Sequence, residues 1–437
     1  MSLVLRYLTL ATFSIATTFA SPIAAAQTPS DRGQQPDLRA LTLREAERLL
    51  LARNRELQAA RRTLAATQAD AITASARPNP TLALGTTNIS PWAGTGPGPL
   101  WDKYVDTTVA LSQVIERGDK REIRMTTAKA LTAAAEQDVG NQLRQSRLAL
   151  ANAYYDLAAA QDKVMISAET MALFDRTIDA AGRRQKAGDI AAADVARIRV
   201  DALRAQSDAL AVQADRARLQ VALAYLIGAD AAAAELRAAD PWPQASAAVI
   251  APVTDEQLDR RPDVQAAARR IDAAQSGREL ARSLRTRDVS VFVQFERWPS
   301  PGNTGSEANS VGLGFSVPIF ARYHYEGEIA RAEADYNSAA DGLERVRAQA
   351  RAELEQARTS VLAAAERLRT YDERLLPEAR KSAEYAEFAY TNGAIGVMDL
   401  LDARRTLRAT QIDAAQVRAD YAKALAAWRV GTGEESQ

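Results

Sequence analysis

Two carboxylates near the C-terminus, Asp399 and Asp402, are the clearest pair of side chains that could do chemistry in this sequence. They lie three residues apart in a stretch with helical periodicity, so both fall on one face of the predicted helix. Two carboxylates on one face can attract cations. Alternatively they only stabilise the helix, because an aspartate near a helix N-terminus interacts favourably with the helix dipole and could pair with Arg404 or Arg405.

Composition excludes most kinds of catalytic site. The chain has 437 residues, no cysteine and one histidine, His324, so one protomer cannot supply a His or Cys metal site, and we expect His324 at a surface or interface. The sequence contains no glycine-rich phosphate loop and no nucleophile motif. Its 55 basic and 55 acidic side chains balance, which argues against a nucleic-acid partner. The sequence therefore predicts neither an enzyme nor a cofactor.

Asp399 follows one of two similar glycine turns, Lys186–Ile190 (KAGDI) and Thr391–Ile395 (TNGAI), each of which separates helical runs. Glycine suits a chain reversal because it adopts positive φ without strain. The preceding runs, 126–187 and 322–392, would be about 90 and 100 Å long as helices, with an interruption near a proline in the second. Helices of this length cannot surround a globular core. We expect coiled coils that end in exposed tips suited to binding a partner.

Two segments with alternating hydrophobicity contrast with the helical runs. In residues 289–317, Val291, Val293 and Phe295 alternate with other residues, and residues 81–114 show the same pattern. A period of two predicts β-hairpins with one apolar face. The strand lengths suit a bilayer, and four aromatic residues near the strand ends suit its interface: Trp92, Trp101, Tyr104 and Trp298. Alternatively, these are ordinary hairpin aromatics and helices cover the apolar faces.

The second half of the chain repeats the first at a spacing of about 205 residues, as from Gly188 to Gly393. In the first repeat Asp194 matches Asp399, and Arg197 stands where the second repeat has Asp402, so an Asp–Arg contact between neighbouring tips could act as a latch. The predicted organisation is a signal peptide at 1–26, a flexible leader at 27–40, the first repeat at 41–228, a connector at 229–253, the second repeat at 254–433 and a tail at 434–437.

The N-terminus predicts export. Residues 1–26 carry a single charge, Arg6, followed by an apolar run and terminal alanines, which is typical of a secretory signal peptide. A membrane anchor is the alternative, but the apolar run is shorter than the roughly 20 residues that a spanning helix needs. No later segment is long and apolar enough to span a membrane as a helix. An integral membrane form would therefore need a closed β-barrel, and three chains with four strands each would close one around a pore.

Several strings resemble the TolC-like outer-membrane efflux proteins over essentially the whole mature chain. In order they are LTLREAERLLLARNRELQAAR, RPNPTLALG, LDRRPDVQAAARRIDAA, LLPEAR and GAIGVMDLLDARRTL. Within this family, VALSQVIERGDKREIR is similar to the CzcC-like heavy-metal efflux branch, with Gly118, Lys120 and Arg121 matching its pattern and Arg117 and Asp119 departing from it.

The corresponding second segment, VPIFARYHYEGEIARAEA, is also similar to that branch. It keeps Arg322 and Gly327, whereas His324 and Tyr325 replace polar residues.

The resemblance implies a mainly α fold with a small β part. Long antiparallel coiled coils would form a periplasmic α-barrel in a homotrimer, the four strands of each chain would enter a twelve-stranded transmembrane β-barrel in the outer membrane, and the connector would join an equatorial belt. The protein would be a passive channel that works with a periplasmic adaptor protein and an inner-membrane efflux pump, most simply for heavy-metal cations. Alternatives are a multidrug or type I secretion outlet and a soluble periplasmic coiled-coil scaffold.

The resemblance also assigns roles to residues. Adaptor docking would use the matching tip positions Lys186, Gly188, Ile190, Asn392, Gly393 and Ile395. The periplasmic gate would be a carboxylate ring of Asp399 and Asp402 from three chains, with Asp194 and Arg197 at the matching positions of the first repeat.

Overall fold

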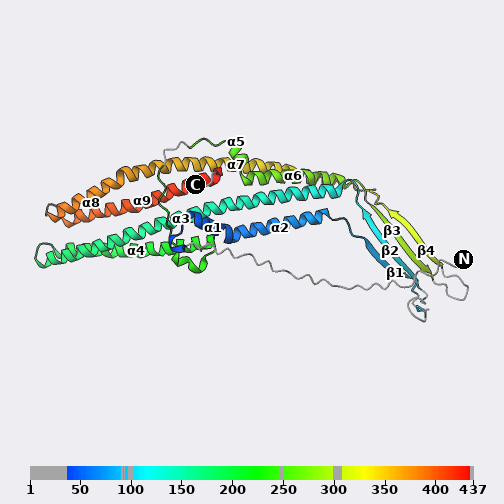
Figure 1. The fold of residues 1–437 in the computed structure, drawn as a ribbon, viewed down its shortest axis with the longest axis horizontal. Helices are drawn as coiled ribbons and strands as arrows, with labels where there is room; N and C mark the ends of the chain where they lie inside the picture. The colour runs from blue at the N-terminus through cyan, green and yellow to red at the C-terminus, as the bar shows by residue number, and fades with distance from the viewer. Residues whose placement is uncertain are drawn as a thin grey trace. The chain divides into compact units, whose positions relative to one another are not determined.

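The computed structural model describes residues 37–89, 92, 94–96, 103, 105–245, 250–298 and 308–433. The chain divides into two units, Met1–Asp37 and Leu38–Gln437, and all of the described helices and strands belong to the second (Figure 1). The predicted signal peptide at 1–26, most of the leader and the tail at 434–437 lie outside the described residues.

The described elements alternate between helical and strand segments in the order that the sequence predicts. In chain order they are η1 (Leu38–Ala40), α1 (Leu43–Arg53), α2 (Arg55–Ser75), β1 (Thr81–Thr87), β2 (Asp106–Ile115), α3 (Lys120–Lys186), α4 (Ala192–Ile227), η3 (Asp230–Glu235), α5 (Asp255–Asp259), α6 (Pro262–Ser283), β3 (Val289–Trp298), β4 (Ala308–Ser316), α7 (Glu326–Thr370), η4 (Tyr371–Leu375), α8 (Leu376–Thr391) and α9 (Val397–Thr432).

Asn54 separates α1 from α2. Asn54 has extended backbone angles, and its side-chain oxygen accepts a hydrogen bond from the Leu57 N–H at 2.9 Å. Its side-chain amide donates to the Leu226 carbonyl at 3.0 Å, and the residue is only 2% exposed. A capping asparagine held by a distant segment therefore breaks the helix without any change in the hydrophobic pattern.

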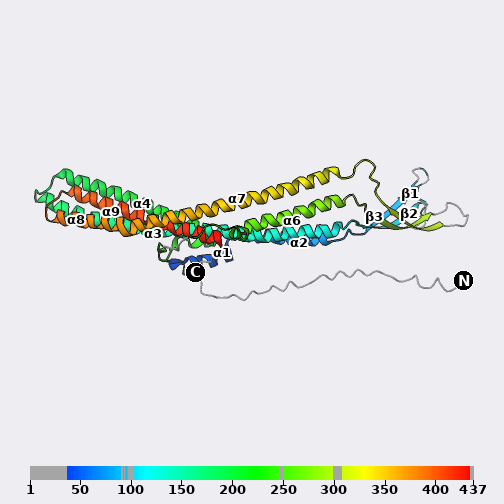
Figure 2. The same cartoon turned by 90° about the horizontal axis from the view of Figure 1, so that it is seen from above.

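The long helix α3 has 67 residues and begins at Lys120, six residues before the predicted start. It packs along α2, α4, α6 and α9, and Figure 2 shows α3, α4, α8 and α9 lying together toward the two glycine turns. Many buried positions of α3 are alanines, which allow close helix approach. Among the helices described, none is long and apolar enough to cross a membrane.

The second long run is interrupted where the sequence predicts, near Pro377. The interruption is the π-helical segment η4, between α7 and α8. Proline lacks an N–H and its ring clashes with the preceding turn of an α-helix, so a wider turn relieves both conflicts. Leu368 and Leu376 are buried on either side of η4, whereas Leu375 is 44% exposed.

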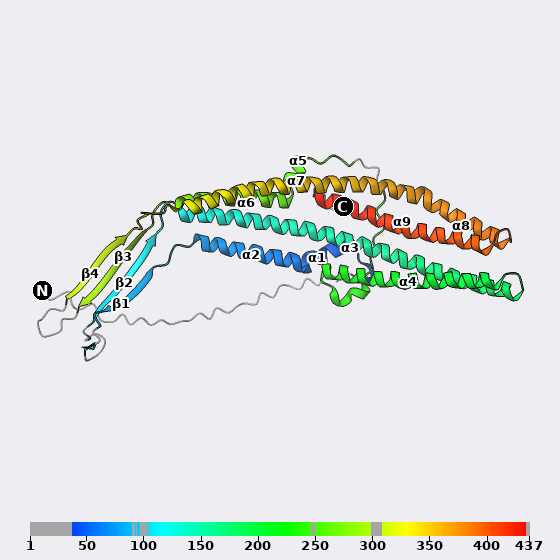
Figure 3. The ribbon, with the colours of Figure 1, turned by 180° about the vertical axis from the view of Figure 1, so that it is seen from behind.

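The four strands form one antiparallel sheet in the order β1-β2-β3-β4, which confirms the two predicted hairpins (Figure 3). The register places Leu82, Leu111, Val293 and Leu313 in one row across all four strands, and each of these side chains is exposed. Since this apolar face is open in the protomer, the alternative in which the protomer's own helices cover it is wrong.

The segment at Leu41 and the connector together enclose the side chain of Tyr154 on α3. The Tyr154 hydroxyl donates to the Leu41 carbonyl at 2.9 Å and accepts hydrogen bonds from the Ala239 and Asp240 N–H groups. Leu41 also forms a parallel bridge with Ala238. Burial raises the pKa of Tyr154 above its ordinary value, so the phenol stays protonated and keeps donating.

Candidate functional site

The two glycine turns reverse the chain in the same way. Gly188 has φ of 87° and Gly393 has φ of 73°, and a Cβ at either position would meet open space. The Gly188 and Gly393 N–H groups donate to carbonyls of the helices that precede them. These glycines are therefore required for their backbone conformation and not for close packing. Of the other predicted docking residues, Lys186 and Asn392 are exposed, whereas Ile190 and Ile395 are half-buried.

An apolar cluster packs the two tips against each other within one protomer. Its buried members are Ala181 of α3, Val195 and Ile198 of α4, and Val397 and Leu401 of α9. The half-buried Ile190 contacts the same cluster. The helices that lead to and from the two tips thus pack together, and of the predicted docking residues Ile190 takes part in this packing.

The predicted gate residues begin the two helices that follow the glycine turns. The Asp399 carboxylate accepts the Gly396 N–H at 3.2 Å and so caps its own helix. Asp402 is exposed. In the first repeat, Asp194 forms a 3.9 Å ion pair with Arg197 within one turn of α4. Helix capping therefore explains part of the role of Asp399, while a contact of Asp194 or Arg197 with a neighbouring tip stays a prediction.

Arginines just beyond the predicted gate join α9 to neighbouring helices, a feature that the sequence analysis missed. Arg405 pairs with Asp201 of α4, whose side chain is 8% exposed, and Arg408 pairs with Asp208 at 3.0 Å. Arg404 pairs with Glu387 of α8 at 3.0 Å. Arg404 and Arg405 therefore do not neutralise Asp399 or Asp402. The seven-residue spacing of Asp201 and Asp208, opposite a basic run, is the signal that could have indicated these pairs.

A groove of about 530 Å³ lies between α3, α7 and α9 and contains a partly buried charge cluster at one side. Arg261 donates to Asp263 at 2.6 Å and to Glu353 at 2.8 Å, and Arg144 lies 3.5 Å from Asp263. Burial alone would raise the pKa values of Asp263 and Glu353, but the hydrogen bonds from Arg261 hold both below their ordinary values. The charged side chains of this cluster pair with one another, which favours a structural role.

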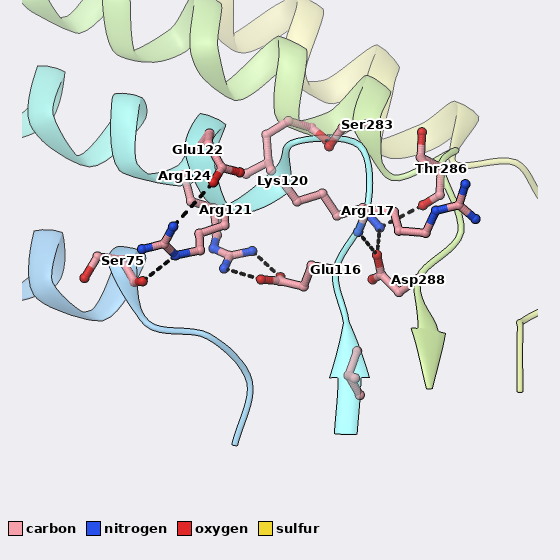
Figure 4. Close-up of polar contacts among 12 residues, drawn as sticks. Ser75, Glu116, Arg117, Lys120, Arg121, Glu122, Arg124, Ser283, Thr286 and Asp288 are labelled. Atoms are coloured by element: carbon pink, nitrogen blue, oxygen red, sulfur yellow. Dashed lines mark hydrogen bonds and ion pairs between the residues drawn. The ribbon is translucent and has the colours of Figure 1, made fainter. Parts of the chain in front are cut away.

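The first strand-to-helix connection, residues 116–119 between β2 and α3, is called here the first elbow together with Lys120 and Arg121 at the start of α3 (Figure 4). The buried Lys120 ammonium donates to the Asp288 carboxylate at 2.7 Å and to the Thr286 carbonyl at 2.8 Å. These contacts join the first repeat to the start of β3. Arg121 donates to the Ser75 carbonyl at the end of α2 at 2.7 Å. Three chain segments therefore meet at this elbow through hydrogen bonds.

Gly118 and Glu116 complete the first elbow. Gly118 has φ of 74°, and a Cβ there would come within 2.8 Å of the Thr286 side chain. Glu116 accepts two hydrogen bonds from Arg124, at 2.5 and 2.9 Å, and these hold the pKa of Glu116 below its ordinary value. The residues Gly118, Lys120 and Arg121, which resemble the heavy-metal branch pattern, thus form an elbow and not a metal site.

The second elbow, residues 317–325 between β4 and α7, uses aromatic rings instead. Tyr325 contacts Phe320 edge-on at 5.3 Å and Tyr323 at 5.9 Å between ring centroids. The Tyr323 hydroxyl accepts the Gly327 N–H at 3.1 Å. His324, the only histidine, has a half-exposed side chain that lies 3.6 Å from Glu326, as the predicted surface placement requires.

The predicted membrane-interface aromatics are only partly described. Trp92 is 97% exposed and Trp298, the last residue of β3, is 42% exposed. Trp101 and Tyr104 lie outside the described residues. Within the described part of the chain, no group of three His, Cys, Asp or Glu side chains is arranged to hold a metal ion.

Most of the chain matches a known protein family and a characterised relative. The family model described as "Outer membrane efflux protein" matches residues 47–229 and 253–434. The cobalt-zinc-cadmium resistance protein CzcC of Cupriavidus metallidurans is 25% identical over 378 residues, covering 84% of each chain.

Two solved structures share the fold. A membrane protein from Pseudomonas aeruginosa superposes with a TM-score of 0.75 at 20% identity, covering 90% of this chain and 92% of that one. The outer membrane protein VceC from Vibrio cholerae superposes with a TM-score of 0.72 at 21% identity, covering 90% and 96%.

Proposed function

The chain belongs to the outer membrane efflux protein family, and we propose that it is the exit duct of a tripartite efflux system for heavy-metal cations. It is an outer membrane efflux channel of the TolC family and not an enzyme. The observation that favours metal cations as cargo is the likeness to CzcC, which extends along 84% of the chain. The elbow segment with Gly118, Lys120 and Arg121 adds to this likeness.

The proposed assembly is a homotrimer in the outer membrane. Each protomer has two unpaired sheet edges, β1 and β4, and one sheet face on which the row from Leu82 to Leu313 is open. Pairing β4 of one protomer with β1 of the next would leave no free edge, and three copies would supply twelve strands around a pore. The apolar face would then lie in lipid, with Trp92 and Trp298 at its boundary.

The proposed recognition and gating site is the tip end. Gly188 and Gly393 hold the reversals, and the exposed Lys186 and Asn392 beside them would contact a periplasmic adaptor. Asp399 and Asp402 from three protomers would place six carboxylates around one aperture, where they would attract cations and repel each other. Energy would come from an inner-membrane pump, since channels of this family are not enzymes.

Opening would require movement of α9 relative to α4. The packed apolar cluster and the pairs of Arg405 with Asp201 and Arg408 with Asp208 join these helices in the protomer. Sliding α9 outward would separate these charges and enlarge the aperture beside Asp399.

Three measurements test the proposal. A strain that lacks this gene should lose resistance to divalent metal cations and regain it with the wild-type gene; sensitivity only to organic drugs would indicate a multidrug outlet. In planar bilayers, Asp399→Ala combined with Asp402→Ala should abolish blockade by divalent cations. Unchanged blockade would contradict the gate, and recovery of the protein from the soluble periplasm would contradict the channel.

A further inference from the structure

Two arginines continue the apolar face of the sheet at the end where the strands meet the helices. The last pair between β2 and β3 is Ile115 with Val289. Extending the alternation by two residues places Arg117 opposite Arg287, on the same face as the apolar rows. Both residues are exposed. On this extended alternation, Arg117 and Arg287 form a two-residue row at the end of the apolar face.

The carboxylates around these arginines are engaged by other cations. Asp288, the neighbour of Arg287 in sequence, accepts hydrogen bonds from the Lys120 ammonium and from the backbone N–H of Arg117. Glu116 is paired with Arg124. Within the described residues, no carboxylate forms an ion pair with the guanidinium of Arg117 or Arg287. Their hydrogen-bond donors remain available to an external anion.

The side chain of Arg287 is held in place by an aromatic ring. Its guanidinium carbon lies 5.2 Å from the centre of the Phe320 ring, in the second elbow. Arginine stacks on aromatic faces and keeps its planar set of donors free, which suits it to binding phosphate. Ile319, beside Phe320, is 83% exposed, and Tyr323 is 50% exposed. Apolar and aromatic surface thus lies next to free guanidinium groups.

We propose that Arg117 and Arg287 bind the phosphate of an anionic phospholipid at the helix-side boundary of the membrane. The inference rests on the proposed function only in taking the apolar sheet face to lie in lipid. Acyl chains would then cover the rows above Ile115 and Val289, and the headgroup phosphates would lie at the level of the two arginines. Charge complementarity and continuity with the apolar face both favour a lipid over a protein partner.

The test compares the Arg117→Gln and Arg287→Gln double variant with the wild-type protein, each extracted from membranes and titrated with phosphatidylglycerol or phosphatidylcholine in detergent. Binding is measured by mass spectrometry of the intact complex. Each arginine near an anionic lipid contributes roughly a factor of five, so the double variant should bind phosphatidylglycerol about 30-fold more weakly. Phosphatidylcholine binding should hardly change. Arg331→Gln is the matched control, because this exposed arginine of α7 lies next to Asp335 and away from the row.

Three results would overturn the proposal. Equal phosphatidylglycerol binding by the double variant and the wild type would show that the row does not bind lipid. Competition by millimolar inorganic phosphate would indicate a site for soluble anions. Loss of the trimer in the double variant, with the control variant intact, would assign the arginines to a subunit contact. Failure of the proposed function is distinguished separately, since wild-type protein would then be absent from the outer membrane fraction.

Discussion

The two elbows bend the chain in the same way but are held by different forces. The long helices α3 and α7 both begin after a residue in the left-handed region, Asp119 with φ of 55° and Tyr325 with φ of 64°, and neither residue caps its helix with a side-chain hydrogen bond. In the first elbow, buried charges such as Lys120 reach into the second repeat. In the second elbow, aromatic rings pack locally.

The difference shows how a duplicated unit can keep one backbone path while its stabilising contacts diverge. The first elbow uses Lys120 and Arg121 in contacts with other segments, so it depends on partners far away in sequence. The second uses aromatic contacts between near neighbours. We therefore expect substitutions in the first elbow to affect stability more strongly than substitutions in the second.

The largest effect is expected at Gly118. Gly118→Ala should lower the free energy of unfolding by about 3 kcal/mol, because the new methyl group combines a positive φ with a close contact to Thr286. Guanidinium denaturation of the detergent-solubilised protein measures this change. Gly393→Ala is the control, since its φ is similar but its surroundings are open, and about 1 kcal/mol is expected. Equal losses would mean that packing against Thr286 contributes nothing.

The next effect is expected at Lys120, whose side chain is 8% exposed. Lys120→Met should cost about 2 kcal/mol, because it leaves Asp288 without its cation. Next to the second elbow, Arg285→Gln should cost less than about 0.5 kcal/mol, because the exposed Arg285 side chain donates one hydrogen bond, to the His324 carbonyl.

The same denaturation measurement compares the two variants. Asp288→Asn added to Lys120→Met should recover part of the loss, since no unpaired charge remains. No recovery in this double variant would argue against the ion pair as the stabilising contact.

A smaller effect with opposite signs is expected at the two left-handed residues. Asp119→Gly removes backbone strain from an exposed residue and should raise the free energy of unfolding by about 0.5 kcal/mol. Tyr325→Gly relieves the same strain but loses two ring contacts, so it should lower stability by about 1 kcal/mol. Thermal unfolding can rank both variants against the wild type. Stabilisation by both would show that the aromatic contacts are unimportant.

The smallest effect concerns pH. The pKa of Glu116 is lowered in the folded state by its hydrogen bonds with Arg124. A carboxylate with a lowered pKa stabilises the fold above its unfolded pKa, and this contribution disappears as pH falls through the lower, folded value. The first elbow should therefore weaken below about pH 4.5. Glu116→Gln should cost less than about 1 kcal/mol of unfolding free energy at pH 7. It should also reduce the loss of stability at acid pH.

The control for the pH measurement is Glu326→Gln, at the first residue of α7 directly after the second elbow. Glu326 is exposed, and its pKa is lowered mainly by backbone hydrogen bonds with His324 and its own N–H. Unfolding midpoints between pH 3 and 7 would reveal whether the acid dependence follows Glu116. If Glu116→Gln loses as much stability at acid pH as the wild type, then other carboxylates, for example Asp263 and Glu353, cause the acid dependence.

Local patterns in the sequence predict much of this fold. The alternation around Val293 and Leu313 identifies strands because side-chain direction in a strand depends only on neighbouring residues. Gly188 and Gly393 mark reversals because positive φ is a property of one residue. Pro377 marks the helix interruption because its missing N–H and its ring are likewise properties of one residue.

Contacts between distant segments could not be predicted in the same way. Lys120 pairs with Asp288, and Arg405 pairs with Asp201, across gaps of 168 and 204 residues. Periodicity carries no information about such partners, and Asn54 breaks its helix through one of them. The capping contact of Asp399 is local, so it follows from neighbouring residues. Its proposed place in a trimeric ring depends on other chains.

The π-helical segment η4 also changes the phase of the coiled coil. Val361 and Leu368 are seven residues apart and buried, so an unbroken heptad pattern would next bury Leu375. Instead Leu375 is exposed and Leu376 is buried, because the wide turn absorbs one additional residue. The additional residue in η4 therefore shifts the buried face of α8 by one residue relative to the heptad pattern of α7. Deleting one residue from 371–375 should convert it to a plain α-helix while preserving the apolar seam that leads to the tip.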